Sequence, residues 1–152
     1  MATSEKNLAD KIAVGRVITK KLTLTNAQLK ALATGFTLVD GIANKTLRFV
    51  GASFYLQAGT NPLTENGDNL VVNYKNAGGV AVSDIIEMTG FIDAAVNMNT
   101  CAVPIKNPIV TSGNSLSQPL VLWNAGVDFA GNAANDAKLV VIVSYIVDNP
   151  KA

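Results

Sequence analysis

The sequence predicts an all-β protein: an antiparallel β-sandwich, jelly-roll-like, of about eight strands with two short helical insertions. First, residues 137–147 read Ala-Lys-Leu-Val-Val-Ile-Val-Ser-Tyr-Ile-Val, a β-branched run that favours a strand over a helix. Second, short alternating segments recur between clusters of Gly, Asn, Asp and Pro, as in sheets joined by turns. Third, the sequence lacks the long helical patterns of β-α-β units, so we do not expect a parallel sheet.

The 137–147 strand is the element around which the sandwich is expected to form. Its alternate residues point to opposite faces, and an exposed apolar edge promotes aggregation, so we expect a central strand with one face in the core. The second face needs a cover, either another layer or another subunit. The wholly apolar set is Leu139, Val141, Val143, Tyr145 and Val147, and the mostly apolar set is Lys138, Val140, Ile142, Ser144 and Ile146.

Other segments follow from the same alternation and from turn residues. Residues 80–88 fit either a strand or a helix. Asn26 is expected to be the N-cap of a short helix over 27–33 that ends at Gly35, and 89–95 fit a second short helix. The remaining strands are expected at 16–25, 36–39, 47–56, 70–74, 98–105 and 119–123.

The chain length of 152 residues suits one domain with a proper core. We expect residues 16–152 to form a single β-sandwich domain and residues 1–15 to form an N-terminal arm. Leu8 and Ile12 lie four residues apart, so the arm is either a short amphipathic turn or an extended segment that orders on a partner. The predicted partner-binding residues are Leu8, Ile12 and Val14 of the arm and Val140, Ile142 and Ile146 of the last strand.

Composition narrows the classes of partner. The net charge is +1, so no bulk field attracts nucleic acid or an anionic membrane, and we expect neither as a partner. No apolar stretch approaches the ~18 residues of a transmembrane helix, and no signal peptide is visible. Charged residues make up only 15% of the chain, against about 25% in typical domains. A surface with so little charge is typical of a protein that is part of an assembly.

Catalytic chemistry finds little support in the residue types. The chain contains no histidine, which excludes Ser-His-Asp and Cys-His catalysis and histidine metal sites. Cys101 is expected to be a small buried apolar group. Glu87 with Asp84 or Asp93 is the acid pair that a glycosidase would need, but nothing directs it to a cleft. We therefore expect no enzyme activity, no catalytic residues, no cofactor and no metal.

Two loop regions and the aromatic residues allow more than one interpretation. The oxygen-rich loops at 66–69 and 128–136 suggest calcium, although turn formation accounts for them better. Core packing is the expected role of the strand aromatics, while a sugar platform is the alternative. That alternative would make the protein a carbohydrate-binding β-sandwich module on a virion or tail, with Trp123 the first suspect. The aromatics concerned are Tyr55, Tyr74, Trp123 and Tyr145.

The order of motifs over residues 16–147 resembles small bacteriophage virion structural proteins with a jelly-roll-like fold. The motifs are Leu-Thr-Leu-Thr-Asn-Ala-Gln-Leu at 22–29, Ala-Ser-Phe-Tyr-Leu at 52–56, Gly-Asp-Asn-Leu-Val-Val-Asn-Tyr at 67–74, Gly-Phe-Ile-Asp at 90–93, Pro-Leu-Val-Leu-Trp-Asn at 119–124 and the final strand.

This resemblance implies a non-enzymatic virion component that binds the lattice of the major capsid protein. It implies a decoration or cement protein, or the base of a head fibre, and a homotrimer on the capsid exterior that is made in the host cytoplasm. Placement on a tail or baseplate stays open. A further hypothesis gives residues 1–15 a docking role, so that their deletion would lower capsid occupancy without unfolding the domain.

Overall fold

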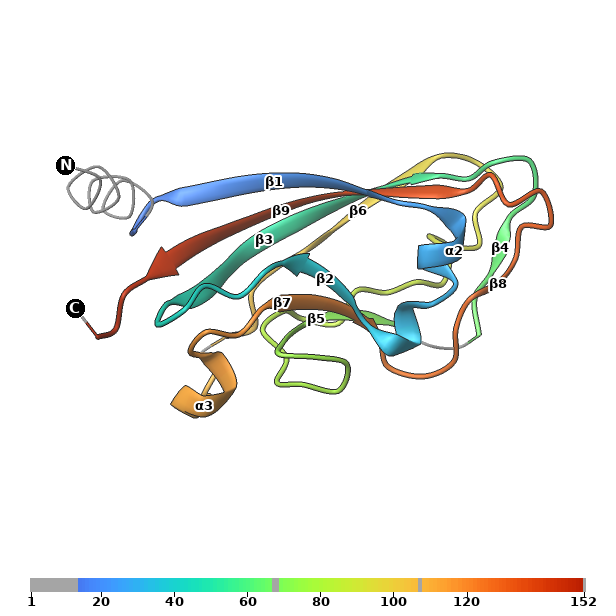
Figure 1. Cartoon of the computed structure of the whole chain (residues 1–152). Coiled ribbons are helices and arrows are strands. Elements are labelled where there is room, and N and C mark those ends of the chain that lie inside the picture. Colours follow the sequence, from blue (N-terminus) through green and yellow to red (C-terminus); the bar gives the residue numbers. More distant parts are fainter. Residues whose placement is uncertain (1–13, 67–68, 107, 152) are drawn as a thin grey trace.

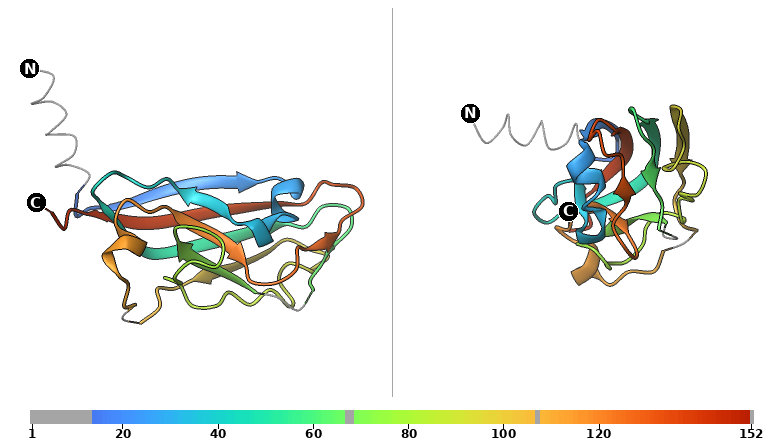
Figure 2. Two further views of the ribbon diagram at one scale, coloured as in Figure 1. Left: turned by 60° about the horizontal axis from the view of Figure 1, so that its bottom comes forward. Right: turned by 90° about the vertical axis from the view of Figure 1, so that its right-hand side faces the viewer.

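The computed structural model describes residues 14–66, 69–106 and 108–151 of the chain. Two antiparallel layers pack face to face, and a short ribbon closes one end (Figure 1). The two further views in Figure 2 show the same two layers from below and from the end. The expectation of an all-β antiparallel sandwich is confirmed.

The larger layer is a four-stranded sheet in the order β1-β9-β3-β6. Its long central strands are β9 (Lys138–Asp148) and β3 (Thr46–Gln57), and its edges are β1 (Val17–Leu24) and β6 (Met98–Ala102). β9 pairs along its length with β1 on one side and β3 on the other. The terminal strand is therefore central, as the exposed-edge argument predicts.

The smaller layer is a three-stranded sheet in the order β2-β7-β5. It comprises β2 (Phe36–Val39), β7 (Leu120–Asn124) and β5 (Leu70–Tyr74). A separate ribbon pairs β4 (Leu63–Thr64) with β8 (Ala130–Gly131). Both pairings of the smaller layer are antiparallel, and between its strands the chain passes through β3, β4 and β6 of the other sheets.

The core lies between the inner faces of the two sheets. The predicted inner set of β9 is buried, and Phe54 of β3 is fully buried beside it. The Tyr74 hydroxyl donates a 2.6 Å hydrogen bond to the Leu47 carbonyl oxygen across the core, which satisfies the one polar atom that this side chain buries. The facing layer contributes Leu70, Val72, Tyr74, Leu120 and Leu122.

The first helical insertion differs from the prediction in its cap and its length. Helix α2 spans only Asn26–Leu29, and a 3₁₀ turn, η1, covers Leu32–Thr34 before Gly35 ends it at φ 84°. The N-cap is Thr25, whose hydroxyl accepts from the Gln28 amide while the Gln28 side chain accepts from the Thr25 amide. This capping box satisfies two backbone donors at once, so the prediction of Asn26 as the N-cap is wrong.

Two other segments take a form that the sequence pattern does not specify. Residues 80–88 are neither helix nor strand, but an extended segment that makes isolated bridges from Ala81 and Ile86 to β5. Residues 89–95 form a turn rather than a helix, since Gly90 adopts φ 76° and its amide donates to the Asp93 carboxylate. A further single turn, α3 (Ser112–Ser115), lies between β6 and β7. Among the described residues, none of the helices is of a length and hydropathy that would cross a membrane.

Candidate interaction surface

The outer face of the four-stranded sheet carries the candidate site. Residues that are register partners in an antiparallel sheet lie on the same face. Rows of such partners therefore cross the sheet outside the core, and in both end and side views no described element lies over them (Figures 1 and 2). The rows that span three or more strands are Val17-Ile146-Arg48, Thr19-Ser144-Gly51, Lys21-Ile142-Ser53-Cys101 and Thr23-Val140-Tyr55-Asn99.

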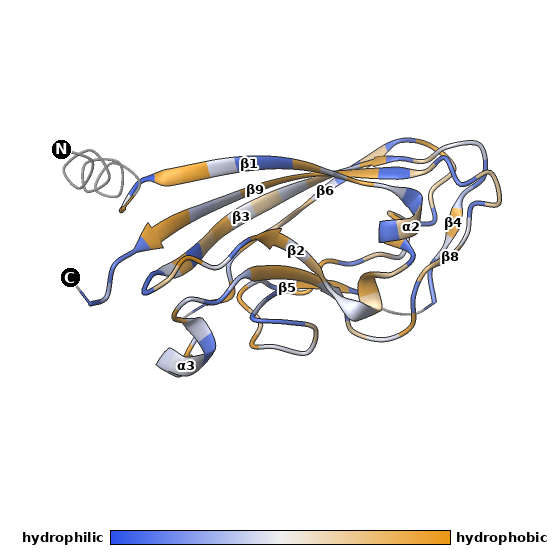
Figure 3. Cartoon of the chain, in the orientation of Figure 1, coloured by the Kyte–Doolittle hydropathy of each residue, from blue (hydrophilic) through white to orange (hydrophobic). Residues whose placement is uncertain are grey.

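This outer face is apolar along its middle. Val140, Ile142 and Ile146 are half-buried by their neighbours in the sheet itself, while Val17 is 59% exposed and Tyr55 is 43% exposed. Hydrophobic residues follow much of β9 and the start of β1 in Figure 3. An apolar strip of this kind on an uncovered sheet face is typical of a protein contact surface.

Two pairs of polar side chains on the face bond to each other. The hydroxyls of Thr19 and Ser144 lie 3.1 Å apart and share a hydrogen bond. At one end of the strip, Arg48 donates to both carboxylate oxygens of Asp148, from Nε at 2.8 Å and from Nη2 at 3.1 Å, and this bonding raises the pKa of Arg48. Covering the strip would therefore leave these two pairs satisfied, whereas Lys21, Thr23, Ser53 and Asn99 in the same rows would need partners from the covering surface.

The six predicted partner-binding residues separate into three groups. Val140, Ile142 and Ile146 share the outer face. Val14 instead packs against the core, forms a parallel bridge to Val147, and is followed by Gly15, whose amide donates to the Val147 carbonyl. Leu8 and Ile12 lie outside the described residues.

Two residues on the face differ from the sequence prediction. Cys101 is exposed, so the expectation of a buried apolar cysteine is wrong. It occupies the outer face of edge strand β6, where its register partner is Ser53, and the polar Asn99 two positions earlier is the signal that marks this face as solvated. Tyr55, expected in the core, also points outward, whereas Tyr74 and Tyr145 are buried as expected.

The candidate acid residues have structural partners in turns. Glu87 accepts hydrogen bonds from the amides of Met88 and Thr89, and those bonds, chiefly the one from Thr89, lower its pKa. Asp93 accepts from the Gly90 amide at 2.7 Å. Within the described part of the chain, no three His, Cys, Asp or Glu side chains gather as a metal site would require.

The oxygen-rich 128–136 loop is held by its own hydrogen bonds. The Asp136 carboxylate accepts from the amide and hydroxyl of Thr60 and from the Asn132 amide group. The buried Asn132 oxygen accepts from Asn26 at 2.7 Å. These contacts close the 59–61 and 132–137 loops onto helix α2, which is the turn-forming role that the sequence favours over calcium.

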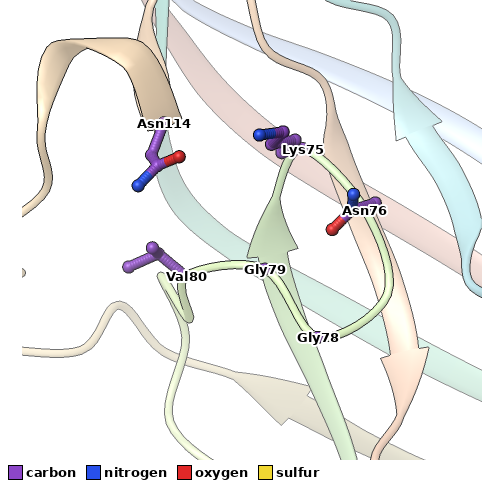
Figure 4. A pocket seen from close by; sticks show the side chains of 6 residues that line it. All are labelled: Lys75, Asn76, Gly78, Gly79, Val80 and Asn114. Atoms are coloured by element: carbon purple, nitrogen blue, oxygen red, sulfur yellow. The ribbon is translucent and has the colours of Figure 1, made fainter.

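Figure 4 shows a hollow of about 250 Å³ beside the turn that follows β5. Asn114 of α3 faces Val80 across it, and Lys75 extends from the other side of the turn. Gly79 lies so close to the Tyr74 carbonyl oxygen that a Cβ there would clash with it. The described residues that line the hollow supply a single cationic group, without a second charged or buried polar group to define a ligand.

Comparisons with known proteins give one partial similarity. No protein-family model matches the chain, and no curated protein matches it. Among solved structures, a chain of the cyanophage Pam1 capsid asymmetric unit is similar with a TM-score of 0.43 and 16% identity, over 86% of this chain and 82% of that chain. A likeness of that size assigns no function.

Proposed function

We propose that this protein is a non-enzymatic structural component of a bacteriophage virion. In this proposal it binds the major capsid protein lattice from the capsid exterior, as a decoration or cement protein or as the base of a head fibre. The ordered motifs over residues 16–147 support the virion class, and the β-sandwich is the fold that this resemblance implies.

The observation that carries the proposal is the uncovered apolar strip on the outer face of the large sheet. We propose that sister copies cover this strip, in a homotrimer. The strip runs along a long strand, the hydroxyls of Thr19 and Ser144 on it bond to each other, and its ion pair lies at one end. Symmetric packing of three copies would bury the same residues in each.

Native mass spectrometry of the wild-type chain and of Ile142→Asp tests the assembly. We expect the wild type to form trimers and the variant to remain monomeric, because the contact would then bury two charged groups, the new carboxylate and its register partner Lys21, at a desolvation cost that often exceeds their attraction. Ile109→Asp is the matched control, since Ile109 is 97% exposed and lies in a loop outside the sheet. A wild-type chain that is monomeric at micromolar concentration contradicts the proposal.

Capsid binding needs its own experiment. Purified protein is added to capsids that lack it, and occupancy is measured for the full chain and for a chain without residues 1–13. This deletion retains the Val14 bridge to Val147, so the sheet edge stays intact. We expect occupancy to fall with the fold unchanged, and equal occupancy of both chains would remove the docking role of the arm.

A further inference from the structure

The outer face of the smaller sheet, on the opposite side of the molecule from the apolar strip, contains a pocket of about 410 Å³. A volume of this size lies within the range of ~300–1,000 Å³ of small-molecule sites. Strands β5 and β7 form its floor, and the extended segment after β5 forms one wall. The pocket is lined by Asn69, Leu70, Val71, Asn73, Gly79, Ala81, Ile85, Trp123 and Ala125.

Asn73 is the unusual residue of this pocket. Its side chain is 1% exposed, yet neither its amide nitrogen nor its amide oxygen has a hydrogen-bond partner among the described residues. Leaving a buried donor or acceptor unpaired costs about 1–3 kcal/mol. An apolar side chain of the same shape would avoid that cost, so the amide is retained at the expense of stability.

Trp123 is held in a fixed orientation beside this amide. Its Nε1 donates a 3.0 Å hydrogen bond to the Ala33 carbonyl oxygen of η1, and its register partner on β5 is Val71. The indole is half-buried, so part of the ring stays open to the pocket that it lines. Ile85, 73% exposed, adds an apolar wall at the rim.

We propose that this pocket binds a neutral pyranose sugar. The C–H face of a pyranose ring is apolar and packs on an aromatic ring, while its hydroxyl groups lie at the edge and need donors and acceptors. The Asn73 amide supplies one acceptor and two donors, which suits a pair of neighbouring hydroxyls. Both of its polar atoms are covered in this structure, so in this proposal the extended segment after β5 moves aside when the sugar binds. None of the described residues that line the pocket is charged, which favours a neutral sugar over a charged one.

The chain contains a single tryptophan, Trp123, so its intrinsic fluorescence reports on this pocket. The wild-type protein is titrated with the methyl pyranosides of glucose, galactose, mannose and N-acetylglucosamine, and with glucuronic acid as the charged comparison. We expect a saturable change in fluorescence with at least one neutral glycoside. No saturable change with any of these glycosides overturns the proposal.

Asn73→Leu is the decisive variant, because leucine branches at the same carbon as asparagine but carries no polar atoms. We expect its stability to stay close to that of the wild type, since the loss of two unpaired buried groups offsets the strain of the larger side chain. We also expect it to weaken glycoside binding at least about tenfold, because it removes the hydrogen bonds to the sugar. Equal affinity in the variant overturns the assignment.

A second variant and a dilution series separate sugar binding from contact between copies. Ile85 lies at the exposed rim, so we expect Ile85→Ala to fold as the wild type does. A fall in its affinity for the same glycoside supports the pocket, and unchanged affinity contradicts it. Fluorescence that changes with protein concentration instead of with glycoside would mean that another copy covers the pocket, which also overturns the proposal. The mass-spectrometry experiment on Ile142→Asp tests the outer face of the larger sheet, and the glycoside titration tests the smaller sheet. The assembly proposal and the sugar proposal can therefore fail independently.

Discussion

Asp136 joins two loops that are far apart in the sequence. Its bonds to Thr60 and Asn132 are made by the ionised carboxylate, and they lower its pKa from 3.8 to about 2. A group whose pKa is lower in the folded state stabilises the fold fully above its unfolded pKa, and this contribution is lost as pH falls toward the folded value.

Stability should therefore depend on Asp136 between pH of about 4 and about 2. Asp136→Asn is expected to unfold at lower urea concentration than the wild type at neutral pH, and the difference should shrink as pH falls through this window. Urea unfolding at a series of pH values measures it, with Asp40→Asn, an exposed loop variant, as control. A difference that stays constant down to pH of about 2 would show that the carboxylate charge is irrelevant.

Tyr74 contributes a single hydrogen bond inside the core. Its hydroxyl donates to the Leu47 carbonyl oxygen at 2.6 Å, and burial is the main cause that raises the pKa of this phenol. Tyr74→Phe should lower the free energy of unfolding by about 1–2 kcal/mol, because the Leu47 oxygen loses a buried partner. Tyr55→Phe, at an exposed phenol on the outer face, is the matched control and should change the stability little.

Single residues are the hardest to place from sequence. In β9 the alternation correctly assigns Val141 to the inner face and Val140 to the outer face, because successive side chains of a strand point to opposite faces and β9 is long enough to show the pattern. Cys101 lies on a short edge strand, where side-chain type alone suggests burial. Asn73 carries no sequence signal at all, since an asparagine within an apolar strand is informative only once its unpaired amide is seen.

At the scale of elements, β9 offers a paired test of the inner and outer faces. Val141 is fully buried, so Val141→Ala should cost about 2 kcal/mol or more in stability through lost burial and the cavity that remains. Val140→Ala alters the half-buried outer face and should cost less than about 1 kcal/mol in the isolated chain. Urea unfolding of both variants, under conditions where the chain is monomeric, checks the pair, and equal costs would mean that the faces are assigned wrongly.

Elements are predictable where local pattern and tertiary packing agree. The strands β1, β2, β3, β5, β7 and β9 carry their own alternation or apolar run. Residues 27–33 have good helix formers, yet the helix stops after one turn. Contacts with distant residues hold the following turn, since the Ala33 amide donates to the Asp128 carboxylate and the Ala33 carbonyl oxygen accepts from the Trp123 indole. Such tertiary contacts override helix propensity, and a short stretch of sequence around residues 27–33 does not reveal them.

For the whole molecule, the sequence indicates that β9 has two apolar faces but not what covers the second one. The smaller sheet covers the inner face, and the described chain supplies no layer for the outer face. A contact between copies or with a shell leaves no periodicity of its own in the sequence. The apolar outer residues and the low fraction of charge are therefore the available signals.

Cys101 provides a direct probe of whether assembly covers this face. It lies in the same row as Ile142 and Ser53 and is exposed in the single chain. If copies pack on the strip, alkylation of the thiol by a maleimide should slow as protein concentration rises, because the thiol becomes buried in the contact. In Ile142→Asp the rate should not depend on concentration, and urea-unfolded wild type gives the unprotected rate. A wild-type rate that stays unprotected at concentrations where mass spectrometry detects trimers would place the contact between copies on another face.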